Sequence, residues 1–333
     1  MRKFSLILLT LALLLTACGG GTDTSTDETA AVEESSESLD APATTVATES
    51  PSGQKTGETF TMLMPALPSN ADFAVYQGTA STAVAAVWAG TILEFKAQDD
   101  PSIQPGIDDV QCFICESFTV DSDGNITVVL PDGLKSAYGN EISSDDVLYT
   151  FERVLANDFV FRFLMGVGSW NTENPITKVD DKTFIVNVTN NVPFTLGTLT
   201  WYSGSILDAT EVKSHATDDD PWAKEWMAGN SATYGPYHLS SFSSGENATL
   251  SLNPGWNKFV PTYSDVVITA VPDSATRLQA MLTGAADYTF KVDYDQLASA
   301  EGNSKVGITE ALESRSVELH LNFADEKFAN KKV

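Results

Sequence analysis

Positively charged residues are scarce in this chain of 333 residues, in which 19 lysines and arginines stand against 45 aspartates and glutamates. The formal net charge is -26 at pH 7. An acidic surface of this kind repels the phosphates of nucleic acids and the headgroups of anionic lipids. The composition therefore argues strongly against both as partners, and the acidic surface mostly serves solubility.

Short motifs of common enzyme classes are also missing. The sequence has no Gly-x-Ser-x-Gly elbow, no His-Glu-x-x-His motif and no phosphate-binding loop. The three histidines, His215, His238 and His320, are scattered, and the paired aspartates lack the spacing of a calcium loop. We therefore expect no enzyme activity, no metal site and no cofactor.

Long apolar runs are limited to one, residues 6–15, which is too short to span a bilayer comfortably. It follows Arg2 and Lys3, and small residues and Cys18 come after it, an order that resembles a bacterial lipobox. We predict that a signal peptide over residues 1–17 is removed and that Cys18 is lipidated, which anchors the mature protein to a membrane. The alternative is an ordinary secretory signal with an incidental cysteine.

Residues 18–57 contain glycine, serine, threonine, alanine and acidic residues, and almost no large apolar ones. Such a segment buries too little surface to offset the entropy lost on ordering, so we expect a disordered tether. The remaining residues, about 275, are enough for more than one lobe with its own core.

Cysteine is rare, since only Cys112 and Cys115 occur besides Cys18. A Cys-x-x-Cys pair can be a redox centre or half of a zinc site. A redox motif opens a helix after a strand, and a zinc site needs two further ligands nearby; the sequence indicates neither context. Outside the cytoplasm, a short local disulfide is the interpretation that we favour.

Apolar residues recur with the spacings of strands and helices from residue 59 onward. The expected strands cover residues 59–64, a hairpin at 117–130, and residues 179–188, 249–252, 266–271 and 287–290. The expected helices cover residues 80–93 and 143–155, and a third begins at Asp273 and ends at Gly284. This alternation indicates an α/β or α+β architecture.

A series of ordered motifs runs through the same region. In chain order they are Asp132-Gly-Leu-Lys135, Ser144-Asp-Asp-Val147, Asp220-Pro-Trp222, Tyr234-Gly-Pro-Tyr237, Asn253-Pro-Gly-Trp256 and Val271-Pro-Asp273. This order resembles family 5 of the extracytoplasmic solute-binding proteins, the oligopeptide-, dipeptide- and nickel-binding receptors of ABC importers.

The resemblance implies an α/β fold of the class II periplasmic-binding-protein type. It implies one lobe built from residues 58–95 and 180–275, with a small lobe of residues 96–179 inserted in it. Residues 276–333 would start a second large lobe. Family members continue well beyond this point, so the second large lobe is expected to be mostly missing, as in a C-terminally truncated member.

The resemblance also implies a ligand site at the cleft between lobes. The candidate ligand-binding residues are Tyr76, Gln77, Gly78, Thr79, Trp201, Tyr202 and Tyr234. The first four would approach an extended ligand through backbone groups, which suits peptides of many sequences, and the aromatics would offer apolar walls. The alternatives are a solvated loop for the first four and core positions for the aromatics.

The function implied by the resemblance is that of a substrate-binding lipoprotein of an ABC importer. It would capture a peptide or similar small solute outside the cytoplasmic membrane and deliver it to the permease subunits, held by its lipid anchor in the periplasm or at the outer cell surface. The alternatives are an adhesin, chaperone or sensor on the same scaffold, or a secreted hydrolase. Receptors for peptides, nickel chelates, opines, oligosaccharides and haem share these motifs, so the ligand stays open.

Overall fold

The structure of the protein, a computed structural model, describes residues 58–75, 87–100, 102–190 and 193–309. All of them belong to one of the two units into which the chain divides, Thr48–Val333. Within these described stretches, no helix is both long and apolar enough to cross a membrane.

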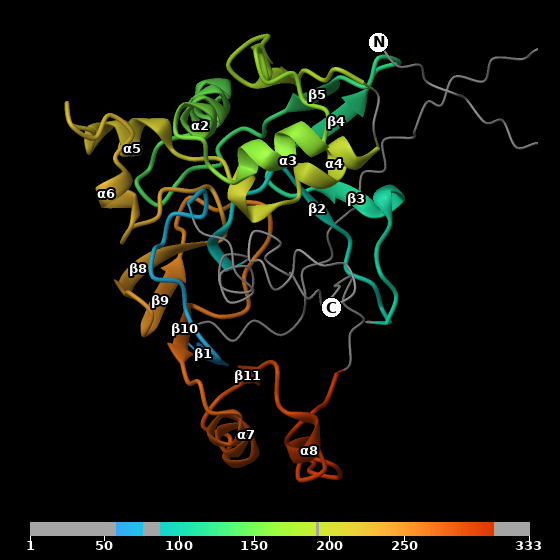
Figure 1. Cartoon of the computed structure of the whole chain (residues 1–333), viewed down its shortest axis with the longest axis vertical. Helices are drawn as coiled ribbons and strands as arrows, with labels where there is room; N and C mark the ends of the chain where they lie inside the picture. The colour runs from blue at the N-terminus through green and yellow to red at the C-terminus, as the bar shows by residue number, and fades with distance from the viewer. Residues whose placement is uncertain (1–57, 76–86, 101, 191–192, 310–333) are drawn as a thin grey trace, which may run out of the picture. The chain divides into compact units, whose positions relative to one another are not determined.

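A five-stranded sheet joins segments that lie far apart in the sequence (Figure 1). Its strands, in spatial order, are β11 (Tyr288–Thr289), β1 (Thr59–Met64), β10 (Asp265–Ala270), β9 (Asn247–Leu252) and β8 (Tyr237–Ser243). Strand β1 runs parallel to β10 and β11, whereas β8, β9 and β10 are antiparallel neighbours. Alternate residues Met62 and Met64 lie in one core with Ile268 and Leu250, which accounts for the strand periodicity of β1.

A four-stranded antiparallel sheet forms from residues between β1 and β8. Its strands, in spatial order, are β4 (Ser117–Val120), β5 (Ile126–Val129), β7 (Thr183–Val186) and β6 (Ile176–Lys178). The turn between β4 and β5 requires Gly124, whose φ of 87° lies in the left-handed region. Ile126 and Val128 of β5 pair with Val186 and Phe184 of β7, and all four are buried.

Helix α2 (Ser144–Ala156) packs against β6. Both the backbone N–H and the hydroxyl of Ser143 donate to the carboxylate of Asp146 at 2.8 Å, a capping box that starts the helix. The apolar face of α2 buries Val147, Phe151 and Val154 in the core that also contains residues of β5 and β7.

The remaining elements are short. They are β2 (Leu93–Phe95), η1 (Ile107–Asp109), β3 (Val110–Cys112), α3 (Phe161–Val167), α4 (Phe194–Thr198), η2 (Tyr202–Gly204), α5 (Ala209–Ser214), α6 (Lys224–Met227), α7 (Ser274–Thr283) and α8 (Tyr294–Leu297). Helix α7 begins at Asp273, whose side chain accepts the Thr276 N–H, and ends at Gly284 with a φ of 77°. Helices α3 and α4 pack against each other.

Most of the expected strands and helices are confirmed: the strands near residues 59–64, 249–252, 266–271 and 287–290, the hairpin at 117–130 and the helices that start near 143 and 273. The strand expected over residues 179–188 is shorter. Asp180 accepts the backbone N–H groups of Lys182 and Thr183, which makes a bend before β7. Residues 80–86 of the helix expected over residues 80–93 lie outside the described residues. Its expected end is wrong, because residues 89–92 are not helical and Leu93 begins β2.

The division into lobes expected from the resemblance stays a prediction. Strands β1 and β8–β10, from residues 58–95 and 180–275, lie in one sheet. Strand β7 comes just after the expected boundary at residue 180, and it belongs to the four-stranded sheet. Helix α7 contacts β11, which extends the five-stranded sheet at its edge.

Candidate functional site

The segment that follows β1 contains Asp72, which forms a buried ion pair with Arg153 of α2. The side chains of Asp72 and Arg153 are 2% and 1% exposed, and their contact is bidentate: Nη2 donates to Oδ2 at 2.6 Å and Nη1 to Oδ1 at 3.3 Å. Arg153 Nε donates to the carbonyl of Trp222 at 3.0 Å, and its guanidinium lies 5.0 Å from the centre of the Phe159 ring. Asp72 also accepts the N–H of Ala74 at 3.1 Å. Both buried charges are therefore paired and hydrogen-bonded.

Backbone hydrogen bonds hold the same segment at two further points. The N–H of Ala71 donates to the carbonyl of Ala228 at 2.9 Å. The N–H of Val160 donates to the carbonyl of Ala74 at 3.2 Å. Val75, the last described residue of the segment, is exposed. The segment is thus fixed up to the point at which its side chains reach the surface.

Four aromatic side chains lie beside this ion pair and form a row from the core to the surface, which we call the aromatic row. The ring of Phe73 lies 4.8 Å from that of Trp88 and meets that of Tyr202 edge-on at 6.1 Å, between ring centres. Tyr202 in turn stacks on Trp201 at 5.6 Å. Trp88 is fully buried, whereas 39% of Trp201 is exposed, so the row ends in a ring that a solute could touch.

A small cavity of about 20 Å³ lies beside the aromatic row and is lined in part by Phe73, Trp88, Arg153 and Tyr202. Ser203 also lines it, and among the described residues neither its hydroxyl nor Trp88 Nε1 has a hydrogen-bond partner. This volume accommodates about one water molecule and no peptide. A solute would therefore contact the exposed end of the row rather than this cavity.

The structure brings some of the expected site residues together and separates others. Trp201 and Tyr202 lie side by side, and Tyr202 contacts Phe73. Tyr234, in contrast, is fully buried in the core with Ile92 and Ile206, and burial strongly raises the pKa of its hydroxyl. The residues expected in the ligand loop, Tyr76, Gln77, Gly78 and Thr79, lie outside the described residues.

Sequence reasoning missed the residues that hold the aromatic row. Arg153 lies on the buried face of α2 between Phe151 and Val154, so a charge within an apolar helical pattern was the available signal. Asp72 and Phe73 lie in a loop without periodicity, and no signal of this kind marks them.

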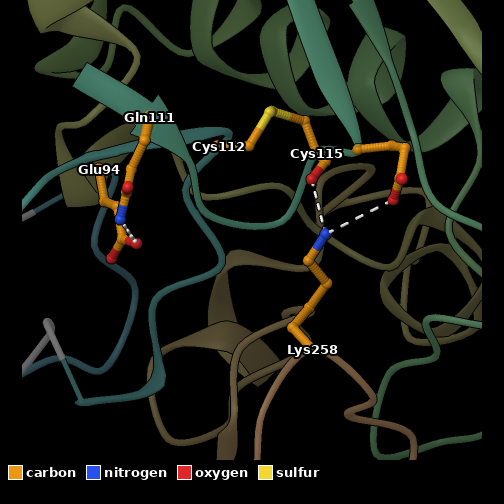
Figure 2. Close-up of a disulfide and its surroundings, with 6 residues drawn as sticks. Glu94, Gln111, Cys112, Cys115 and Lys258 are labelled. Atoms are coloured by element: carbon orange, nitrogen blue, oxygen red, sulfur yellow. Dashed lines mark hydrogen bonds and ion pairs between the residues drawn. A yellow bond between two sulfur atoms is a disulfide. The ribbon is translucent and has the colours of Figure 1, made fainter. Parts of the chain in front are cut away.

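Cys112 and Cys115 are joined by a disulfide, with their Cα atoms 5.1 Å apart (Figure 2). Lys258 Nζ donates to the carbonyl of Cys115 at 2.7 Å and lies 3.9 Å from a carboxylate oxygen of Glu116. Burial lowers the pKa of Lys258, and the charge of Glu116 partly offsets this effect. Both sulfur atoms are used in the disulfide, which leaves neither as a thiol or a metal ligand.

A polar groove of about 660 Å³ lies beside Lys258. Its second lysine, Lys182, donates to the carboxylate of Glu141 at 2.7 Å and to the carbonyls of Pro131 and Ile142 at 3.1 and 3.0 Å. Protein oxygens thus already match both positive charges of the groove, so the lysines are poorly placed to select an anionic solute.

Two carboxylates are buried at the N-termini of helices. Asp208 accepts from the hydroxyl of Ser136 at 2.5 Å and from the amide of Asn140 at 2.9 Å. Asp146 accepts the N–H of Ala209 at 2.8 Å. Burial raises the pKa of Asp146, and the charge of Asp208 adds to this effect, whereas hydrogen bonds oppose it. These groups join α2 to α5, and among the described residues no cluster of three or more His, Cys, Asp or Glu could hold a metal ion.

Solved structures share this fold at low sequence identity. The ABC transporter-associated periplasmic binding protein DppA from Helicobacter pylori, solved with the peptide STSA, aligns with a TM-score of 0.63 and 20% identity, over 74% of this chain and 49% of its own. MoaA from A. tumefaciens R10, solved with mannopinic acid, aligns with a TM-score of 0.64 and 18% identity, over 82% of this chain and 53% of its own. The fold is the α/β fold of class II periplasmic binding proteins, as expected.

Sequence comparison specifies the family. The model of the bacterial extracellular solute-binding proteins, family 5 (middle), matches residues 109–333, so the chain belongs to this family. The probable D,D-dipeptide-binding periplasmic protein DdpA of Escherichia coli K12 is 28% identical over 235 residues, which are 69% of this chain and 43% of that protein. The resemblance seen in the sequence motifs is confirmed, and the chain spans about half the length of the relatives that it matches.

Proposed function

We propose that this protein is the solute-binding component of an ABC importer, which captures a peptide or a similar small solute outside the cytoplasm and delivers it to permease subunits in the membrane. Membership of family 5 supports this proposal. The observation that carries it is the aromatic row. Trp201 presents an exposed ring and stacks on Tyr202, which contacts Phe73 in the segment that leads into residues 76–79.

The names of the relatives suggest the class of solute. One is described as binding D,D-dipeptides, one was solved with the peptide STSA and one with mannopinic acid. An extended peptide would lay its backbone along Tyr76–Thr79 and its side chains against the exposed ring of Trp201, which the buried Tyr202 supports. Main-chain hydrogen bonds are common to all peptides, and flat apolar walls tolerate many side chains, so this arrangement favours broad specificity.

The proposal includes an extracytoplasmic location and a lipid anchor. The apolar run of residues 6–15 and the small residues before Cys18 motivate both, because this order resembles a lipoprotein signal. A binding protein that is anchored in the same membrane as the permease would have a high effective concentration near it.

Calorimetric titration of the purified chain with STSA, D-alanyl-D-alanine and mannopinic acid tests the function. We expect at least one to bind and to raise the Tm, because a solute that binds the folded state stabilises it by mass action. Trp201→Ala should weaken that binding about tenfold, since loss of an aromatic anchor costs more than about 1 kcal/mol. Tyr294→Ala, which removes an aromatic side chain 83% exposed on α8, is the matched control. Lack of binding to all three, or hydrolysis of the peptides, would contradict the proposal.

A further inference from the structure

The buried ion pair lies one residue away from the aromatic row, and this proximity gives it a role in the site. We propose that Arg153 is a positioning residue for solute binding: through Asp72 it holds Phe73 against Tyr202, and so fixes the exposed ring of Trp201. This inference rests on the proposed solute-binding function and adds to it a residue that does not touch the solute.

The connection consists of short, successive contacts. Arg153 holds both carboxylate oxygens of Asp72, and Phe73 is the next residue in the chain. The rings of Phe73 and Tyr202 contact each other edge to face, at an interplanar angle of 88°. Tyr202 then stacks on Trp201 at an interplanar angle of 28°. A shift of Asp72 is therefore transmitted to Trp201 through two rings only, those of Phe73 and Tyr202.

Packing alone does not fix Phe73. Its side chain is only partly buried, and it lines the small cavity together with Tyr202. A ring that borders a cavity lacks packing contacts on that side, so packing restrains it less than it restrains a fully enclosed ring. The segment around Phe73 also belongs to no helix or strand. The polar anchors at Asp72 and at the adjacent backbone therefore set its position.

The arginine side chain suits this role because its contacts point in different directions. Its fork holds Asp72, its Nε holds the carbonyl of Trp222, and its flat face covers the ring of Phe159. A lysine ammonium is a single point charge and cannot reproduce this set of contacts. Arg153 thus ties the segment that bears Phe73 to α2 and to the chain before α6.

A purely stabilising role for the pair is the competing explanation. Buried ion pairs are weak contributors to stability, because desolvation offsets most of their attraction, and apolar replacements are often as stable. A positioning role predicts a loss of affinity that exceeds what the loss of stability explains. The two explanations therefore differ in how solute affinity and Tm change together.

The experiment compares four variants with the wild type by calorimetry, at a temperature well below every Tm. The probe is whichever of STSA, D-alanyl-D-alanine and mannopinic acid the wild type binds most tightly. We expect Arg153→Lys to weaken binding at least tenfold, and Asp72→Asn, which keeps the side-chain shape but removes its charge, to do the same. Arg162→Lys, at an exposed ion pair 2.8 Å long, should bind as the wild type does. Val186→Ala, in the buried core of β7, should lower the Tm without changing affinity.

The inference is overturned if both Arg153→Lys and Asp72→Asn bind like the wild type, or if Val186→Ala loses as much affinity for an equal loss of Tm. Circular dichroism checks folding, and Asp72→Asn decides the matter if Arg153→Lys does not fold. If the wild type binds none of the probes, the proposed function fails, but acrylamide quenching of Trp201 fluorescence still tests positioning. Quenching of Trp201, isolated by subtraction of a Trp201→Phe background, should increase in Arg153→Lys, and unchanged quenching refutes the inference.

Discussion

Reduction of the disulfide between Cys112 and Cys115 is expected to lower the free energy of unfolding by about 2 kcal/mol. The two residues are separated by three positions, so the bond closes one of the smallest loops that a disulfide can close. The loop-entropy relation for such a loop yields roughly 2 kcal/mol at 25 °C, at the low end of the range for disulfides. A change of this size should lower the Tm of a domain of this length by about 4–8 °C.

The loss should stay near this value because other contacts hold the same turn. Lys258 donates to the carbonyl of Cys115, and the ring of Phe113 lies 5.4 Å from that of Trp256. The N–H of Phe113 also donates to the carbonyl of Ile92 at 3.1 Å. Cys115 is fully buried, and a buried thiol packs as a small apolar group, so reduction leaves no new charge in the core.

Urea unfolding of oxidised and reduced protein measures this difference, with reduction carried out in the unfolded state and thiols counted afterwards. Lys258→Met should lower the free energy of unfolding more in the reduced protein than in the oxidised one, by about 0.5 kcal/mol or more. The reason is that the disulfide and the contacts of Lys258 constrain the same turn. Equal stability of the two forms would show that the contacts around Lys258 suffice. A loss above about 4 kcal/mol would show that the loop-entropy account is wrong.

Three further predictions concern pH, packing and processing. Burial raises the pKa of Asp146 above that of the unfolded chain, about 3.9, so its contribution to wild-type stability falls as the pH rises through the folded pKa. The Tm of Asp146→Asn relative to the wild type should therefore rise between about pH 4 and pH 7, and a constant difference would speak against this cause. Gly235→Ala places a Cβ 2.6 Å from the carbonyl oxygen of Trp88 and should lower the free energy of unfolding in urea by about 2 kcal/mol. Gly229→Ala, whose Cβ would meet no atom of the described residues within 4 Å, should not. Intact-mass analysis of protein from a bacterial host should show a lipidated Cys18 at the N-terminus, and a retained leader would contradict this.

Local structure could be predicted where it leaves a periodic trace in the sequence. Met62 and Met64 alternate with less buried residues in β1, and Val147, Phe151 and Val154 recur along α2. Strand β8 was missed because its sequence, Tyr-His-Leu-Ser-Ser-Phe-Ser, has few apolar residues and its register with β9 shifts between Leu239 and Ser241. A bulge of this kind breaks the alternation on which strand prediction depends.

Aromatic side chains show where prediction of the candidate site reaches its limit. Trp201 is partly exposed, whereas Tyr234 is fully buried, although both occur in segments without a clear periodicity. A large apolar ring gains from burial in any core and equally serves as a wall for a solute. Residue type therefore marks an aromatic position as a candidate for the ligand site, and only the surrounding fold decides whether the ring lies in the core or at the surface.

Arg153 illustrates the other limit, because a buried charge implies that a partner exists but does not identify the partner. A charge on the buried face of an amphipathic helix needs an opposite charge or several hydrogen bonds, so α2 alone implies that an acidic group lies nearby. The chain offers 45 acidic residues, and the one used, Asp72, lies 81 positions away. Contacts between residues so far apart depend on the tertiary arrangement, here on the pairing of β1 with β10. No local sequence pattern encodes this pairing. The residues that touch a solute are thus easier to nominate from sequence than the residues that hold them in place.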